Sequence, residues 1–413
     1  MLEWLSAHAK TSERLACSPL KEYLCGYLAH LIAQHYPRKT VRKYADILLA
    51  FGSFFGQQPG LEITKLAESV EPFLVQLASR LPSAAKAKPT INGFLRYLRQ
   101  AGVIPAAESA VPAHPDAELV EAYCTALRTR RALKEVTIRH IRGTCRVFMA
   151  FLTTEGEMSL RTVQPDVIHR FVISRGHRCS RGSLRTECSS IRGYLLYLHR
   201  CGAVALDLSR FIVAPRVYQH DQCPRFLTRP QIDAVLAVID RKTPVGRRDY
   251  AMLLLLTVYG LRGMEATRLR LDDIEWRNKK LHIRGRKSGN NTTYPLAMSV
   301  DNAIVDYLRN GRPVSSHREV FLSVIAPFRP LLDGAALASH IVKFLQQAGV
   351  KVHRPGTHLF RYSCAQRLFE EGMSLKFIGD YLGHTDLHST QRYTKIAFDQ
   401  LREVALGDAE DLL

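Results

Sequence analysis

The stretch GTHLFRYSCAQRLFEEG, residues 356–372, places His358 and Arg361 three positions apart in a segment with helical apolar spacing. Residues at this spacing lie on one face of a helix. The imidazole of His358, which can carry a proton, and the permanently charged guanidinium of Arg361 therefore project from the same side. Further on, LGHTDLHSTQRYT, residues 382–394, contains His384 and Tyr393. Histidine moves protons near neutral pH, and tyrosine acts as a nucleophile when its oxyanion is stabilised.

A second basic position follows the apolar run AMLLLLTV, which is too short to cross a membrane and predicts a buried core helix. In YGLRGMEATRLRL the glycine breaks this helix, and Arg262 stands before the next one. Such a break presents a guanidinium near a helix N-terminus, which itself favours anions. Glu265, three residues later, is expected to orient the arginine from behind.

The segment KKLHIRGRKSGNNTTYPL, residues 279–296, alternates apolar and polar residues on both sides of SGNN, which predicts a β-hairpin. Lys287 falls at the expected tip, where a positive charge can reach a groove or a leaving oxygen. Arg284 and Arg286 precede it and are predicted to contact a DNA backbone.

Each of these residues has an ordinary structural explanation when it is taken alone. Their order and helical context point together to phosphodiester transfer, because two arginines neutralise a phosphate while a phenol attacks it. The predicted catalytic set is Arg262, Lys287, His358, Arg361, His384 and Tyr393.

The composition agrees with a polyanionic partner. Among 413 residues, 58 Lys and Arg stand against 38 Asp and Glu, a formal net charge of +20. The nine cysteines form no C-x-x-C pair, and the N-terminus has no secretory pattern. We therefore expect reduced thiols and a cytoplasmic, nucleoid-associated protein with no membrane partner.

The first two hundred residues contain a diverged repeat. TVRKYADILLAFGSFF from Thr40 matches TIRHIRGTCRVFMAFL from Thr137, and INGFLRYLRQAGVIP matches IRGYLLYLHRCGAVA about 100 residues later. Apolar spacing predicts about four amphipathic helices in each copy. The two threonines are expected as N-caps, and Gly102 and Gly202 as C-terminal caps.

Residues from about 225 to 400 resemble the catalytic domain of the tyrosine recombinases, which include phage integrases and Xer-type resolvases. The motifs YGLRGMEA, the hairpin lysine before YPL, HLFR and LGHTDLHSTQRYT carry the resemblance. Tyr362 stands where a second histidine is common, and Gly263 replaces a larger residue; neither change removes a catalytic group. The resemblance implies a mainly α fold with a small β-sheet in the catalytic domain (α+β), preceded by two SAM-like helical DNA-binding domains. The expected domains are 1–110, a copy of the next; 116–215, the core-binding domain; and 220–413, the catalytic domain.

The resemblance also implies an activity. We expect a site-specific DNA recombinase or integrase that cuts and rejoins strands through a 3′-phosphotyrosyl intermediate, in integration, excision or transposition of a mobile element. No cofactor or metal is expected. The expected partners are double-stranded DNA, a homo-tetramer on two DNA sites formed from monomers or weak dimers, and accessory recombinases or DNA-bending proteins. A catalytically silent DNA-binding protein and a relaxing type IB topoisomerase remain the alternatives.

Overall fold

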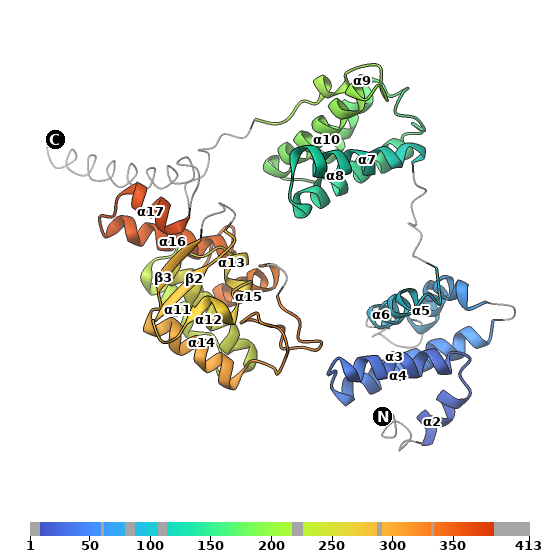
Figure 1. Cartoon of the computed structure of the whole chain (residues 1–413). Helices are drawn as coiled ribbons and strands as arrows, with labels where there is room; N and C mark the ends of the chain where they lie inside the picture. Colours follow the sequence, from blue (N-terminus) through green and yellow to red (C-terminus); the bar gives the residue numbers. More distant parts are fainter. Residues whose placement is uncertain are drawn as a thin grey trace. The chain divides into compact units, whose positions relative to one another are not determined.

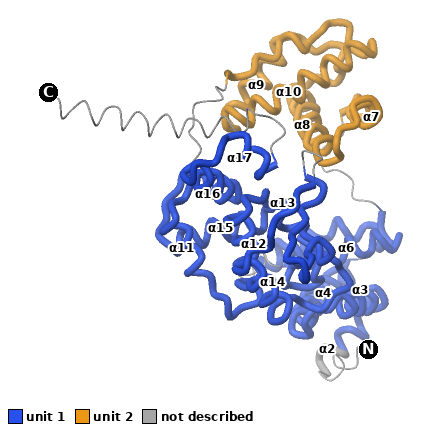
Figure 2. Tube along the Cα trace, turned by 60° about the vertical axis from the view of Figure 1, so that its left-hand side comes forward, with its two compact units in different colours: residues 1–105, 223–413 blue, residues 106–222 orange. Residues whose placement is uncertain are grey.

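The structure, a computed structural model, describes seven stretches of the chain: residues 9–58, 62–78, 87–105, 114–216, 226–286, 291–331 and 334–383. The chain divides into two compact units, residues 1–105 with 223–413 and residues 106–222 (Figure 2). Buried apolar side chains form separate clusters in the first helical segment (residues 9–105), the second helical segment (residues 114–216) and the C-terminal segment (residues 226–383). Each segment is therefore described by itself.

The first helical segment is built from amphipathic helices around a core of leucine and aromatic side chains. Its core includes the apolar face of the longest helix, which has Val41, Leu48 and Phe55 on it, as the periodicity predicts. In order, the elements are α2 Ala9–Ala16, α3 Lys21–Ala33, α4 Arg38–Gly56, η1 Ile63–Ser69, α5 Val70–Ala78 and α6 Ala87–Gln100 (Figure 1).

The second helical segment repeats this arrangement around its own core. Gly202 ends its last helix with a φ of +71°, and Gly102 ends α6 with a φ of +70°, so both predicted C-terminal glycines are confirmed. The elements are η3 Pro115–Ala117, α7 Glu118–Arg131, α8 Glu135–Thr154, α9 Pro165–Gly176, α10 Arg181–Arg200 and η4 Leu208–Phe211.

The expected threonine N-caps are wrong. Helix α4 begins at Arg38 and α8 at Glu135, so Thr40 and Thr137 both lie inside the first turn. The N-cap residues are Pro37 and Lys134, and neither gives a side-chain cap. The backbone carbonyls of these two residues accept the first helical hydrogen bonds instead.

Aromatic packing is equivalent in the two helical segments. In each segment, one tyrosine contacts two aromatic rings of the last α-helix. The ring centroids are 5.4 Å apart in both pairs of the first segment. In the second segment they are 5.4 Å and 5.1 Å apart. These contacts fall at the positions that repeat in the sequence. The pairs are Tyr27–Phe94, Tyr27–Tyr97, Tyr123–Tyr194 and Tyr123–Tyr197.

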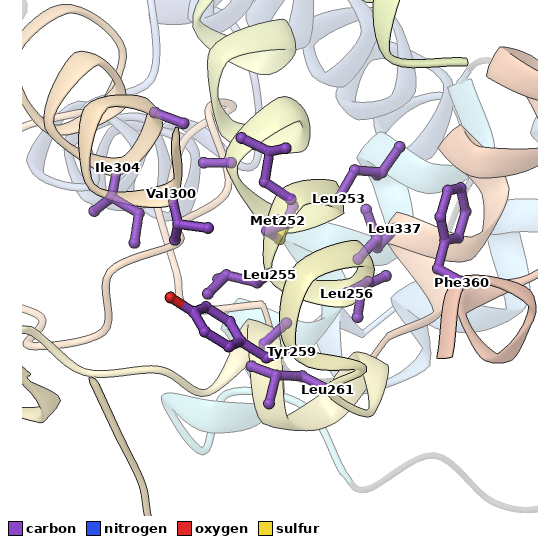
Figure 3. Packing of buried hydrophobic residues seen from close by; sticks show 14 of the residues in the cluster. Met252, Leu253, Leu255, Leu256, Tyr259, Leu261, Val300, Ile304, Leu337 and Phe360 are labelled. Carbon is purple, nitrogen blue, oxygen red and sulfur yellow. The ribbon is translucent and has the colours of Figure 1, made fainter. Parts of the chain in front are cut away.

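The C-terminal segment packs around one helix whose second half is apolar on every side. Helix α12, Pro244–Tyr259, has residues 251–256 buried, which confirms the predicted core helix. Each fully buried side chain of this kind contributes roughly 1.5–3 kcal/mol. Side chains of three other helices pack around it, and Figure 3 shows Met252, Leu253, Leu255 and Leu256 with Val300, Ile304, Leu337 and Phe360.

The predicted hairpin is present and gains a third strand. Strands β2 and β3 pair antiparallel with Leu281 opposite Tyr294, and β1 adds to the other edge of β2. The C-terminal segment thus combines helices with one small sheet, as the sequence predicts. Its elements are α11 Arg229–Ala237, α12, α13 Gly263–Thr267, η5 Leu271–Asp273, β1 Ile274–Glu275, β2 Lys280–Ile283, β3 Thr292–Pro295, α14 Met298–Asn310, α15 Ala335–Gln347, α16 Thr357–Glu370 and α17 Leu375–Leu382.

Candidate active site

Arg262 lies at the break between α12 and α13, as predicted. Gly260 ends α12 with a φ of +60°, and Arg262 is the N-cap residue of α13. Glu265 accepts a hydrogen bond from the Arg262 backbone N–H at 2.9 Å and another from its Nη1 at 2.7 Å. The side chain of Glu265 is 8% exposed and that of Arg262 is 24% exposed. The carboxylate therefore holds the guanidinium from the protein side while part of the fork still reaches solvent.

Arg361 is buried and joins the ends of two helices. Its Nη1 donates to the backbone carbonyl of Gly260 at 2.6 Å, and its Nη2 donates to the carbonyl of Leu382 at 2.7 Å. These oxygens belong to the C-terminal ends of α12 and α17, where helix carbonyls lack intrahelical partners and carry partial negative charge. Arg262 donates to the next such carbonyl, that of Gly383, at 3.2 Å. The two predicted arginines thus meet at the end of α17.

His358 lies one turn before Arg361 on α16 and is exposed. Its pKa is lowered, first because surrounding protein removes part of its water and then because the Arg361 and Arg262 charges repel a proton. Glu265 acts in the opposite direction. The imidazole is therefore neutral near pH 7 and able to accept a proton.

Arg286 lies in the interior, so the prediction that it contacts a DNA backbone is wrong for this structure. The residue is 1% exposed. Its Nη1 donates to the Thr292 hydroxyl at 3.0 Å and its Nη2 to the Tyr294 hydroxyl at 2.8 Å. Strand β3 and the end of α17 close over this guanidinium, so its two Nη atoms bond to buried polar groups of the protein.

Arg284, in contrast, is exposed on the hairpin and pairs with Asp273 at 3.0 Å. Its predicted backbone contact stays a prediction. Lys287, His384 and Tyr393 lie outside the described residues. His384 directly follows Gly383 in the sequence, and Lys287 directly follows Arg286.

The sequence did not predict the contact between Tyr294 on β3 and Tyr381 on α17, which lies beside Arg286. The Tyr294 hydroxyl donates to the backbone carbonyl of Tyr381, and the two rings meet edge-on with centroids 5.0 Å apart. Burial raises the pKa of both phenols, so both stay protonated. The alternation of β3 predicts that Tyr294 points inward, but nothing local in the sequence identifies its partner.

The described part of the site therefore has two fixed guanidiniums, a carboxylate behind one of them and a neutral imidazole. Guanidiniums are the side chains best suited to oxyanions, and a neutral imidazole is a proton acceptor, so the chemistry of this set fits a reaction at a phosphate. Among the described residues, no helix combines the length and the apolar character that crossing a bilayer requires.

Comparisons with known proteins bear on this site. Residues 225–400 match the phage integrase family. The putative integrase/recombinase y4rA of Sinorhizobium fredii is 31% identical over 398 residues, which cover 95% of this chain and 96% of that protein. The tyrosine recombinase XerC of Oceanobacillus iheyensis is 27% identical over 289 residues, covering 69% of this chain and 93% of that protein. In fold, the chain is similar to the XerH site-specific recombinase in its post-cleavage complex with a palindromic difH substrate (TM-score 0.53, 17% identity), over 70% of this chain and 84% of that one.

Proposed function

The chain belongs to the phage integrase family, the tyrosine-type site-specific recombinases, and we propose that Tyr393 is the nucleophile with which it cuts DNA. The Tyr393 oxygen forms a bond to the scissile phosphorus, and the bond from phosphorus to the 5′ oxygen breaks. The product is a 3′-phosphotyrosyl link and a 5′-hydroxyl. A 5′-hydroxyl from a partner strand then attacks the link, restores the diester and releases the tyrosine.

Five further residues supply the surroundings for this step: Arg262, Arg361 and His358, which the structure describes, and Lys287 and His384, which lie outside the described residues. Arg262 and Arg361 bind the nonbridging oxygens and stabilise the charge that develops on them. His358 takes the proton of Tyr393, which its lowered pKa allows at neutral pH. Lys287 donates a proton to the leaving 5′ oxygen, and His384 hydrogen-bonds the phosphate.

The observation that carries the proposal is the shared anchoring of the two arginines. Both donate to backbone carbonyls at residues 382–383, immediately before His384. A guanidinium pair fixed by rigid helix ends needs no reorganisation when the phosphate becomes more charged.

Regarding assembly, we infer that the two helical segments are DNA-binding domains, 1–110 and 116–215, ahead of a catalytic domain at 220–413. Strand exchange between two duplexes requires four cuts, and each chain has one proposed nucleophile, so we propose a homo-tetramer on two DNA sites. The proposed context is a mobile element. Light scattering on the assembled complex counts the chains, and a complex of two would contradict the tetramer.

A suicide substrate tests the nucleophile. DNA nicked beside the scissile phosphate loses the short 5′-hydroxyl strand after cleavage, which traps the covalent adduct. Tyr393→Phe is expected to abolish the adduct on a denaturing gel and to leave the gel shift intact. Tyr250→Phe, on the far part of α12, is the matched control and should form the adduct.

The outcomes separate the alternatives. An adduct formed by Tyr393→Phe would refute the nucleophile. The absence of an adduct with the unaltered chain, with binding retained, would support a silent DNA-binding protein. Relaxation of supercoiled plasmid without a specific site would support a topoisomerase.

A further inference from the structure

Arg286 is the buried residue that joins the parts of the proposed active site. Its side chain is fully buried, and its two Nη atoms bond to hydroxyls of Thr292 and Tyr294 on strand β3. Nη1 also lies 3.5 Å from the backbone carbonyl of Tyr381, at the end of α17. Nη2 lies 3.7 Å from the Glu265 carboxylate. One guanidinium thus contacts the hairpin, α17 and the carboxylate that holds Arg262.

Arg286 precedes one proposed catalytic residue in the chain and contacts the residue that precedes another. Lys287 is the next residue along the chain. A Cβ on Gly383 would overlap the Arg286 guanidinium, so the residue before His384 has to be small for this packing. Arg286 therefore fixes the backbone on one side of Lys287 against the backbone on one side of His384.

Stability alone does not explain a charge at this position. Burying a guanidinium removes its hydration, and well-packed apolar residues often replace buried ion pairs without loss of stability. The Arg286 Nε is also buried without a hydrogen-bond partner among the described residues. The planar fork instead gives directional bonds to several groups at once, which fixes geometry.

We propose that Arg286 is a positioning residue that holds the base of the hairpin so that the Lys287 amine donates its proton to the leaving 5′ oxygen. This inference rests on the proposed role of Lys287. Arg286 itself does not touch the DNA. The proton passes from the Lys287 nitrogen to the 5′ oxygen as the phosphorus–oxygen bond breaks.

A change of leaving group tests this role in the full chain. A nicked substrate with sulfur in place of the 5′ bridging oxygen releases a thiolate, which needs no proton to leave. Loss of a general acid slows cleavage about 10²- to 10⁴-fold, and the sulfur substrate should remove most of that loss. We expect Arg286→Met and Lys287→Ala to be slow on ordinary DNA and close to the unaltered chain on the sulfur substrate. Both should retain the gel shift.

The controls separate positioning from folding. Lys280→Met, an exposed change in the same hairpin, should cleave both substrates at the unaltered rate. Arg286→Lys, which keeps the charge but not the fork, should show the same sulfur rescue with a smaller defect. If Arg286→Met does not fold, Tyr294→Phe removes the hydroxyl that accepts from Nη2 and donates to the Tyr381 carbonyl, and it should give a weaker version of the same pattern.

Each outcome decides something. If Lys287→Ala is rescued by sulfur and Arg286→Met is equally slow on both substrates, Arg286 is only a structural residue and this inference fails alone. If Lys287→Ala is not rescued, the proposed role of Lys287 is wrong and the inference falls with it.

Discussion

At the residue scale, the carboxylate of Glu265 is shared by two arginines. It makes a close ion pair with Arg262 at 2.7 Å and lies 3.7 Å from Arg286. Burial lowers the pKa of His358 most, the Arg361 and Arg262 charges lower it further, and the Glu265 carboxylate acts to raise it. Glu265 therefore sets the direction of one guanidinium and partly offsets the loss of proton affinity of the neighbouring imidazole.

The first prediction concerns that proton affinity. In the DNA-free protein, the pKa of His358 should lie below its ordinary value of 6.5. Glu265→Gln should lower it further, because the substitution removes a charge that attracts the proton. Titration by nitrogen-15 NMR measures both, with His358→Gln to assign the signal. Asp233→Asn, in an exposed ion pair on α11, is the control and should not move it.

The sign for stability follows from the same shift. The unfolded chain binds the His358 proton more tightly than the folded chain, so this histidine makes folding less favourable as the pH falls from 6.5 through the folded pKa. A bound phosphate should raise the pKa of His358. A pKa above 6.5 in the DNA-free protein would contradict the electrostatic account.

At the element scale, the C-terminal ends of helices α12 and α17 hold the two arginines of the site from the protein side. Their last carbonyls bind Arg361 and Arg262, and Gly260 allows α12 to end where it does. A Cβ added to Gly260 would lie 2.5 Å from Leu382 Cδ2 and 3.2 Å from Cys364 Sγ. The glycine is therefore needed for its left-handed backbone and for the close approach of α16 and α17.

The second prediction compares two glycines of one backbone conformation. Gly349 has a φ of +68°, and a Cβ there meets nothing within 4 Å. Gly349→Ala should cost roughly 1–2 kcal/mol of unfolding free energy, from the left-handed conformation alone. Gly260→Ala should cost more, because it also displaces Leu382, and it should slow cleavage by moving the carbonyl that holds Arg361.

Urea unfolding and the suicide-substrate assay measure these effects. Equal losses of stability in the two variants would show that the contact with α17 is unimportant. A Gly260→Ala protein with an unchanged cleavage rate would show that the helix end does not position Arg361.

At the scale of the whole molecule, charge is distributed beyond the catalytic segment. Helix α4 has four exposed basic side chains in its first two turns and no acidic residue in its first turn. The N-terminus of a helix itself favours anions, so the helix end and the exposed basic side chains attract a phosphate together. The exposed cluster is Arg38, Lys39, Arg42 and Lys43.

The third prediction is that this part of the first helical segment contacts DNA phosphates. Arg42→Glu with Lys43→Glu should weaken DNA binding and reduce the salt dependence of log Kd by about 2, since each phosphate contact contributes about 0.9. Lys21→Glu with Lys65→Glu changes the net charge by the same amount on α3 and η1. Gel shifts over a range of salt concentrations, with the full chain, compare the two pairs. Equal effects would mean that net charge alone matters.

By itself, the sequence determined the features that depend only on residues close together in the chain. Helical periodicity placed Arg262 at the end of a buried helix and His358 one turn from Arg361, and strand alternation placed the hairpin. The order of the basic residues and the two tyrosine-recombinase motifs near the carboxyl end indicated the chemistry. These are local properties because helix and hairpin geometry repeat over a few residues.

Only the tertiary structure decided which groups hold the arginines. Arg361 bonds to a carbonyl about a hundred residues away, and Arg286 is buried by Tyr294 together with Tyr381, on a helix that is nearly as distant in the chain. An arginine in a polar turn is predicted to be exposed, because its sequence neighbours do not show which distant elements cover it. Burial is set by the packing of whole helices and strands. Because of that packing, Arg286, which was expected to contact DNA, bonds to groups inside the protein.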